Sequence, residues 1–437
     1  MAIISGNGAI FGTDAADQIT GGDGNDSLVG GAGADVLNGG PGVDFAEYPT
    51  SPFGIEASIA AGVVGNDGTG SSDTLIGIEG IVGSLNNDRL FGSALPDVLV
   101  GLTGADTIDG GAGDDLLRGN AGADQIAGGD GIDTAFYGGG LRSYSLGVAG
   151  GGFTVIDNRS AGDADGTDSV SGVEILSFAD GRLVFDANDP AARVARLYEA
   201  ALDRLPDQAG LNAWTAAVQE GQPLSGLAAG FLASDEFGAR FGGIGDNGAY
   251  VDRLYQNVLG RAGDAAGREA WIGALNAGTS RADVLVAFSE SAESKAGTGA
   301  LVRNGIWDRS EAAAEVARLY DTVFGRLPDA LGLTVWKNAI EGGGATPVQV
   351  ADAFTSSAEF RAQYGDLNNR DFANALYVNT LDRAADQAGL EYWTGALNAG
   401  LTRAEVVRAF SESREHVALT AANIQSENPA EFGILFA

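Results

Sequence analysis

The chain has 437 residues, room for about two to four domains, and a formal net charge of −34. So acidic a surface argues against nucleic acid and against an anionic membrane as partners. Cysteine is absent, so there are no disulfides, and export is neither required nor excluded. No apolar run is long enough for a membrane span, and Met1–Asp14 lacks the basic start and apolar core of a secretory signal peptide.

Two segments, Gly12–Glu47 and Gly83–Phe136, consist of nine-residue units that begin with Gly and carry Asp in sixth place. The first six residues of a unit are turn-forming, and the last three can form a short strand with the aliphatic eighth residue pointing inward. Two units make one coil of eighteen residues, and stacked coils predict a parallel β-roll. The sixth-place aspartates are Asp17, Asp26, Asp35, Asp44, Asp88, Asp97, Asp106, Asp115, Asp124 and Asp133.

Carboxylates one coil apart would lie near one another, because stacked strands are spaced by about 4.8 Å. Each such pair repels by about 0.9 kcal/mol in water and by about 3.5 kcal/mol at an effective dielectric constant of about 20. Calcium removes this repulsion, since it accepts six to eight carboxylate and carbonyl oxygens in flexible geometry. We therefore expect several calcium ions, bound by the ten aspartates and by the turn glycines Gly22, Gly24, Gly31, Gly33, Gly111, Gly113, Gly129 and Gly131.

These units resemble the glycine-rich nonapeptide repeats of the RTX (repeats-in-toxin) family, whose pattern is GGxGxDxUx. The resemblance implies calcium between successive coils, folding after export, and type I secretion. Three leading units depart from the pattern, with Ala15, Asn86 and Leu95 in place of the fourth glycine. Their sites are expected to be weaker or missing, because solenoids place atypical repeats at their ends.

Between the two runs, Tyr48–Val82 is expected to continue the roll as irregular coils; its piece Ser72–Ser84 resembles a connector between RTX runs. Residues 137–189 predict a β cap. Asp163 and Glu174 are spaced like the first and twelfth residues of an EF-hand loop, but Asp168 stands where that loop needs glycine, so a turn is favoured.

Beyond Pro190 a helical period begins, and a second repeat ends at Trp214, Trp271, Trp336 and Trp393. Each of these repeats also contains one recurring Asp and one recurring Arg. The Asp is expected to cap the helix that leads to Trp, and the Arg to pair with that Asp or to close the preceding helix. The units resemble an uncharacterised helical domain of secreted and surface-layer proteins and, more distantly, phycobilisome linkers. The predicted organisation is multidomain, β then α: roll 1–136, cap 137–189, helical repeat pairs 190–302 and 303–416 forming an all-α array, and a C-terminal secretion signal 417–437.

The sequence contains no nucleophile elbow and no Ser-His or Cys-His pairing for nucleophilic catalysis, while a pair of carboxylates for glycoside hydrolysis stays open, with no feature that singles out one pair. The single histidine, His416, forbids an H-E-x-x-H site and is expected to be a solvated residue at a helix C-terminus. We predict a secreted, non-enzymatic, calcium-folded protein of the cell surface or extracellular matrix, surface-layer-like or adhesin-like, in which self-association or cell-surface polysaccharide is the partner. The alternative is a polysaccharide-binding lectin or a polysaccharide-active enzyme with exposed Tyr or Trp.

Overall fold

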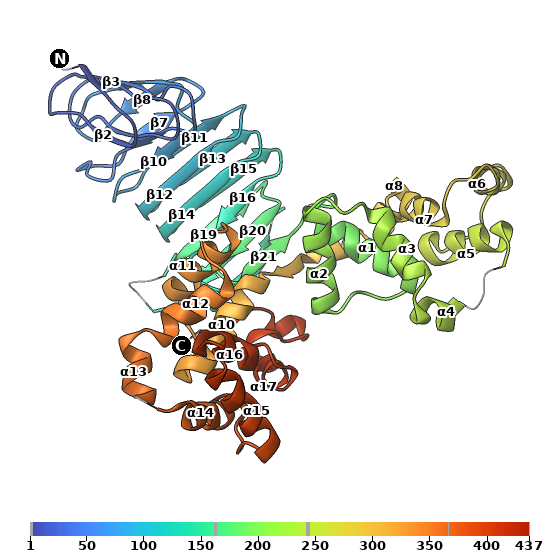
Figure 1. Ribbon diagram of the computed structural model, residues 1–437. Coiled ribbons are helices and arrows are strands. Elements are labelled where there is room, and N and C mark those ends of the chain that lie inside the picture. Colours follow the sequence, from blue (N-terminus) through green and yellow to red (C-terminus); the bar gives the residue numbers. More distant parts are fainter. Residues whose placement is uncertain (1–2, 150, 161–163, 242–244, 366, 437) are drawn as a thin grey trace. The chain divides into compact units, whose positions relative to one another are not determined.

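The computed structural model describes residues 3–149, 151–160, 164–241, 245–365 and 367–436. The chain divides into two compact units. The first contains Met1–Gly181, Ala312–Ser426 and Ala430–Ala437, and the second contains Arg182–Glu311 and Glu427–Pro429. The predicted fold class is confirmed: strands fill the N-terminal part and helices the C-terminal part (Figure 1).

The N-terminal strands form a roll of two mainly parallel sheets. One sheet has the order β1-β3-β5-β9-β8-β7-β11-β13-β15-β19-β18-β17, and the other runs β2-β4-β6-β10-β12-β14-β16-β20 within the first unit. The strand bounds are β1 Ile3–Ser5, β2 Ala9–Phe11, β3 Gln18–Thr20, β4 Ser27–Val29, β5 Val36–Asn38, β6 Phe45–Glu47, β7 Glu56–Ser58, β8 Val63–Asn66, β9 Asp73–Ile76, β10 Gly80–Val82, β11 Arg89–Ser93, β12 Val98–Gly104, β13 Thr107–Ala112, β14 Leu116–Gly122, β15 Gln125–Asp130, β16 Thr134–Phe136, β17 Tyr144–Ala149, β18 Gly152–Asp157, β19 Thr167–Ser171, β20 Ile175–Phe178, β21 Gly181–Val184 and β22 Ile306–Arg309.

The register of the roll follows the eighth-place aliphatic residues. Ile19 pairs with Leu37, Leu99 with Leu117, and each partner lies eighteen residues along the chain. The eighth-place side chains are at most 2% exposed, so a single line of side chains fills the interior between the sheets. Because this core is thin, burial of apolar area contributes little to each coil.

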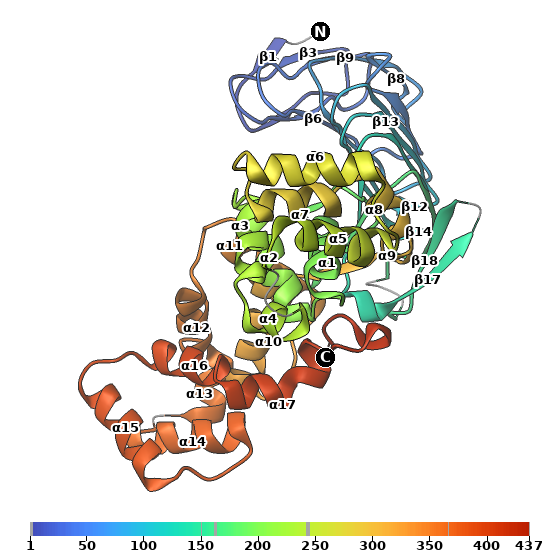
Figure 2. The same cartoon turned by 90° about the vertical axis from the view of Figure 1, so that its right-hand side faces the viewer.

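Two features interrupt the parallel stack. Strand β8 pairs antiparallel with both β7 and β9, which inserts a short meander between the two runs. At the C-terminal end, β17 and β18 form an antiparallel hairpin that continues onto β19 (Figure 2).

The helical half contains two cores, one in each compact unit. In the second unit, Arg182 forms ion pairs with Asp189 and Asp308. The helix bounds are α1 Pro190–Leu202, α2 Gln208–Gln219, α3 Leu224–Leu232, α4 Asp235–Phe241, α5 Asn247–Leu259, α6 Ala265–Asn276, α7 Arg281–Ser289, α8 Ala292–Gly297, α9 Gly299–Asn304, α10 Glu311–Phe324, α11 Ala330–Glu341, α12 Pro347–Thr355, α13 Ala358–Tyr364, α14 Asn369–Leu381, α15 Gln387–Asn398, α16 Arg403–Ser411 and α17 Arg414–Ile424. None of the described helices has the length and apolar character that crossing a bilayer requires.

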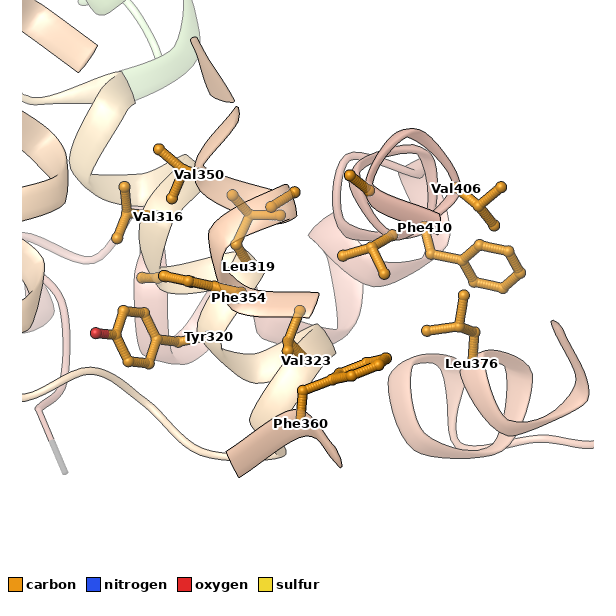
Figure 3. Close-up of a cluster of buried hydrophobic side chains, with 14 of the residues drawn as sticks. Val316, Leu319, Tyr320, Val323, Val350, Phe354, Phe360, Leu376, Val406 and Phe410 are labelled. Atoms are coloured by element: carbon orange, nitrogen blue, oxygen red, sulfur yellow. The ribbon is translucent and has the colours of Figure 1, made fainter. Parts of the chain in front are cut away.

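Side chains of the helical repeats explain their recurrence in the sequence. Figure 3 shows Tyr320 of α10 beside Phe354 of α12, with ring centroids 4.7 Å apart, inside the apolar core of the second pair. The repeated aspartates accept a main-chain hydrogen bond at helix N-termini, as expected; for Asp329 the donor is Gly332 N–H at 2.7 Å. These residues therefore serve packing and capping.

One expectation for the helical half was wrong, and a second is met at Arg383, whose Nη1 lies 3.9 Å from Asp386 Oδ2 of its own repeat, but is not the main contact of the repeated Arg. His416 is fully buried near the start of α17; its Nε2 lies 2.9 Å from Asp321 Oδ2 and its Nδ1 2.9 Å from the Ser411 carbonyl oxygen. The repeated Arg makes its close ion pair with a Glu of a later helix and stacks on the repeat's Tyr: Arg326 bonds Glu359 at 2.9 Å and lies 5.2 Å from the Tyr320 ring centroid.

The C-terminal segment packs against the end of the roll inside the first unit. Ile434 is fully buried, and its N–H donates to Asp180 Oδ2 at 2.6 Å. Burial raises the pKa of Asp180 to about 6, while hydrogen bonds from the main-chain N–H groups of Ile434 and Leu141 lower it.

Candidate metal sites

The ten sixth-place aspartates lie in two rows along the roll, and each is at most 2% exposed. Within a row, the N–H of one aspartate donates to Oδ1 of the aspartate one coil later. The N···Oδ1 distances are 2.7 Å for Asp17–Asp35 and Asp26–Asp44, 2.8 Å for Asp88–Asp106, Asp97–Asp115 and Asp106–Asp124, and 2.9 Å for Asp115–Asp133. All six predicted pairs are therefore neighbours in the structure.

The second carboxylate oxygen exists in two different environments. In the two leading units of each run it accepts the N–H of the unit's second residue, as Asp97 Oδ2 does from Ser93 at 2.5 Å. The same bond joins Asp17 to Thr13, Asp26 to Gly22 and Asp88 to Ser84. In the other units this oxygen is buried and has no hydrogen-bond partner among the described residues: Asp35, Asp44, Asp106, Asp115, Asp124 and Asp133. We call these six atoms the orphaned Oδ2 oxygens.

The backbone conformation of the second residue separates the two groups. In each of the six units with an orphaned Oδ2 oxygen, the second residue is left-handed: φ is 90° at Gly31, 100° at Gly40, 81° at Leu102, 99° at Gly111, 65° at Asn120 and 117° at Gly129. In the four leading units it does not have a positive φ. A non-glycine residue such as Leu102 adopts this conformation at a cost of about 1–2 kcal/mol, and such strain concentrates at functional sites.

Glycine in the first place lets oxygens converge beside the turn. A Cβ on Gly110 would clash with Asp115 Oδ2 and with the carbonyl oxygen of Gly128, one coil later. The same clash pattern occurs at Gly101 with Asp106 and Gly119. At these two glycines a carboxylate oxygen and a carbonyl oxygen of the next coil therefore approach one point. The same convergence occurs in the leading units at Gly21, Gly83 and Gly92, so the missing hydrogen bond, and not the convergence, sets the orphaned oxygens apart.

Burial and neighbouring charge disfavour ionisation of these carboxylates. Burial raises the pKa of Asp106 to about 7, and the charges of Asp124 and Asp88 raise it further, against a lowering hydrogen bond from Asp88 N–H. Burial likewise raises the pKa of Asp115 to about 6, with contributions from Asp133 and Asp97. Without a cation, the roll therefore holds charged groups that are both desolvated and close together.

Four more carboxylates continue the rows, and the sequence interpretation missed them. Asp73 Oδ1 accepts the N–H of Asp35 at 2.9 Å, and Asp168 Oδ1 accepts that of Asp124 at 3.0 Å. Glu79 Oε2 and Glu174 Oε2 accept the N–H groups of Asp44 and Asp133, each at 3.0 Å. The available signal was a shared pattern, Asp-Thr/Ser-Leu/Val-x-Gly-Ile/Val-Glu, at residues 73–79 and 168–174. Asp163, the first residue of the rejected EF-hand spacing, lies outside the described residues.

The predicted turn glycines mostly take the conformation that the site needs. Seven of the eight are left-handed, and Gly22 differs because its N–H binds Asp26 Oδ2. Among the described residues, no group of three Asp, Glu or His side chains forms a metal cluster. The oxygens that converge beside the first-place glycines are carboxylate and carbonyl oxygens, an all-oxygen set that fits calcium and not zinc.

Comparison with known families identifies both halves of the chain. The family model "RTX calcium-binding nonapeptide repeat (4 copies)" matches residues 11–46, 82–117 and 100–135. These two segments of the roll are RTX nonapeptide repeats. The family model "Domain of unknown function (DUF4214)" matches residues 189–241, 228–298, 310–364 and 351–420, just over half of the chain. The chain therefore belongs to the DUF4214 family and carries RTX repeats in its N-terminal roll.

Individual proteins add little to these family matches. No curated protein matches the chain. The crystal structure of the extracellular lipase LipA from Serratia marcescens is 19% identical over 38% of this chain and 38% of that chain, with a TM-score of 0.12. The RTX protein thus spans 38% of the length of that lipase structure, and the likeness carries no argument about activity.

In the described part of the helical repeats, the recurring aromatic side chains are core residues, and Tyr392 beside Trp393 is an exposed exception. The repeated tyrosines are buried, at 4–7% exposed for Tyr198, Tyr255, Tyr320 and Tyr377. The four repeat tryptophans are partly buried and pack on the same cores. Their rings are therefore placed as core residues rather than as an exposed platform for sugars.

Proposed function

We propose that this RTX protein is a secreted, non-enzymatic protein of the cell surface or matrix whose N-terminal roll folds on binding several calcium ions. The six orphaned Oδ2 oxygens carry the proposal. Leaving a buried acceptor without a partner costs about 1–3 kcal/mol, and more when the group is charged. Six such atoms together are comparable with the whole stability of a domain, about 5–15 kcal/mol.

The roll's own residues would hold the ions in a defined way. Bound calcium supplies positive charge and accepts further oxygen ligands. The aspartates Asp35, Asp44, Asp106, Asp115, Asp124 and Asp133 would provide the orphaned Oδ2 oxygens, and the turn glycines would provide carbonyl oxygens. The leading units, whose Oδ2 oxygens are already hydrogen-bonded, would hold ions weakly or not at all.

The same chemistry would make the chain exportable. In a calcium-poor cytosol, repulsion along the two carboxylate rows keeps the roll open, and a type I secretion system could transport it. Outside the cell, calcium near the about 10⁻⁴–10⁻³ M range of extracellular modules would close it. The helical half would then serve assembly or adhesion, as the company of RTX and DUF4214 repeats suggests.

A direct test is the far-UV circular dichroism of the full chain in chelator and in calcium. We expect calcium to add β signal to a helical spectrum that is already present, since the helical cores are apolar. Magnesium at the same concentration should add less, because it requires tighter octahedral geometry. A spectrum unchanged by calcium would reject calcium-coupled folding. Light scattering in calcium would then test the assembly role, which a strictly monomeric protein would contradict.

A further inference from the structure

We infer that the two connector segments, residues 73–79 and 168–174, contribute a terminal cation site to each run, with Glu79 and Glu174 as ligands. The inference rests on the proposed function and extends it beyond the nonapeptide units. The RTX matches end at residues 46 and 135, so they include neither glutamate.

The last aspartate of each run needs a partner that the run itself does not contain. Asp44 and Asp133 are fully buried, and each has an orphaned Oδ2 oxygen. No nonapeptide unit follows Asp44 before the connector at 73–79, and none follows Asp133 before 168–174. Any oxygen that completes these two sites from the later coil must come from the connectors.

The connectors bring a carbonyl oxygen to each orphaned Oδ2 oxygen. A Cβ on Gly39 would clash with Asp44 Oδ2 and with the Gly77 carbonyl oxygen. A Cβ on Gly128 would clash with Asp133 Oδ2 and with the Gly172 carbonyl oxygen. The two oxygens converge here as they do beside Gly110 inside the second run. Gly77 and Gly172 share a left-handed backbone, with φ of 56° and 57°.

The glutamates occupy the next position of the carboxylate row. Asp44 N–H donates to Glu79 Oε2, and Glu79 N–H donates back to the Asp44 carbonyl oxygen, both at 3.0 Å. Asp133 and Glu174 repeat this arrangement at 3.0 and 3.1 Å. The second carboxylate of the connector comes six positions after the first, whereas successive units place their aspartates nine positions apart, so the longer glutamate replaces aspartate.

The other row ends differently in the first run. Tyr48 donates its hydroxyl hydrogen to Asp73 Oδ2 at 2.9 Å, so the protein itself satisfies that terminal oxygen. The two rows are thus not equivalent at the connector. The glutamate end keeps an orphaned aspartate oxygen beside a carbonyl, a donor set for a divalent cation of calcium size.

The test counts calcium ions bound to the full chain by isothermal titration calorimetry and equilibrium dialysis. The variants are Glu79→Gln and Glu174→Gln, which keep side-chain shape and the carbonyl acceptor for the aspartate N–H. The matched control is Glu56→Gln, an exposed strand residue of the same roll. We expect each connector variant to bind one ion fewer than wild type and the control to bind the full number.

The outcomes separate this inference from the proposed function. A wild-type protein that binds no calcium overturns both. Wild-type binding with unchanged ion counts and affinities in both Gln variants overturns this inference alone. If neither Gln variant folds at the calcium concentrations that fold wild type, the titration is continued to higher calcium. Recovery of β signal at a raised calcium midpoint supports the glutamates as ligands, and no recovery at any calcium concentration overturns the inference.

Discussion

Replacing Asp115 by Asn should reduce calcium binding, whereas the same change at Asp97 should not. The two residues are successive members of one row, joined by the 2.8 Å bond from Asp97 N–H to Asp115 Oδ1. Both are nearly fully buried. They differ in Oδ2, which accepts the Ser93 N–H in Asp97 and is orphaned in Asp115. The pair therefore isolates the orphaned oxygen from burial, charge and position.

Asp115→Asn should lower the stability of the roll in calcium and raise it in chelator. In calcium, Asp115→Asn loses one ion, which at free calcium of about 100 times the dissociation constant removes about 2.7 kcal/mol of stability. In chelator the same change removes repulsion from Asp97 and Asp133, worth about 2–7 kcal/mol between the aqueous and partly buried limits. Asp97→Asn likewise relieves repulsion in chelator, from Asp115 and Glu79. In calcium it loses no ion and weakens one charge-assisted hydrogen bond by about 1 kcal/mol, because the amide oxygen still accepts.

Hydrogen exchange read by mass spectrometry on peptides covering β12–β15 measures local stability, and calorimetry counts ions. We expect Asp115→Asn to bind one ion fewer and to lose protection in calcium, and Asp97→Asn to keep the wild-type ion count and nearly the wild-type protection in calcium. Equal loss of ions in the two variants would refute the assignment of the orphaned oxygens as ligands. So would a destabilisation by Asp115→Asn that is as large in chelator as in calcium.

Three further predictions follow from the same contacts. Burial raises the pKa of Asp106 to about 7 and that of Asp168 to about 8. In chelator the protonated groups therefore stabilise the roll at low pH, and this stability is lost as pH rises through about 4–8. Acidification should increase the protection of the roll against hydrogen exchange, and a loss of protection would contradict this. Gly129→Ala should abolish calcium-induced folding because its Cβ would clash with the Gly111 carbonyl oxygen. Gly24→Ala has open space around its Cβ and should cost only the about 1–2 kcal/mol of a positive φ, so equal effects of the two changes on the circular dichroism titration would reject the close approach of coils. In the helical half, Glu412→Gln should lower the free energy of unfolding by about 3–5 kcal/mol, because it removes the charge that pairs with the buried Arg318. The control Glu359→Gln, at an exposed ion pair, should lower it by less than about 1 kcal/mol, and thermal denaturation in chelator compares the two variants.

The roll was predictable because one chemical requirement repeats every nine residues. The eighth-place aliphatic residues and the sixth-place aspartates define both the core and the pairing between coils, and residues such as Ile108 and Ile126 pair as their spacing requires. The helix-capping aspartates were predictable for a similar reason, since a cap acts within three residues of its own position.

The errors arose where partners are far apart or the spacing changes. Arg326 pairs with Glu359, 33 residues later, and nothing local selects that partner over the nearby Asp329. His416 is buried against Asp321, 95 residues earlier, so its local position at the end of the repeat gave no warning. Glu79 was missed because the step from Asp73 is six residues instead of nine.

The division between leading and later units could not be derived from glycine content alone. Gly22 is a glycine that does not adopt a positive φ, whereas Leu102 and Asn120 adopt one without being glycine. The decisive factor is the preceding coil. Where a nonapeptide unit stands one coil earlier, the turn of the later unit stacks on the carbonyl oxygens of the earlier one, as Gly113 does on Leu95. The first two units of a run have no such nonapeptide neighbour, so their second N–H turns inward and satisfies Oδ2. Orphaned oxygens therefore arise from stacking itself, which is why a run of repeats, and not a single unit, would create the demand for calcium.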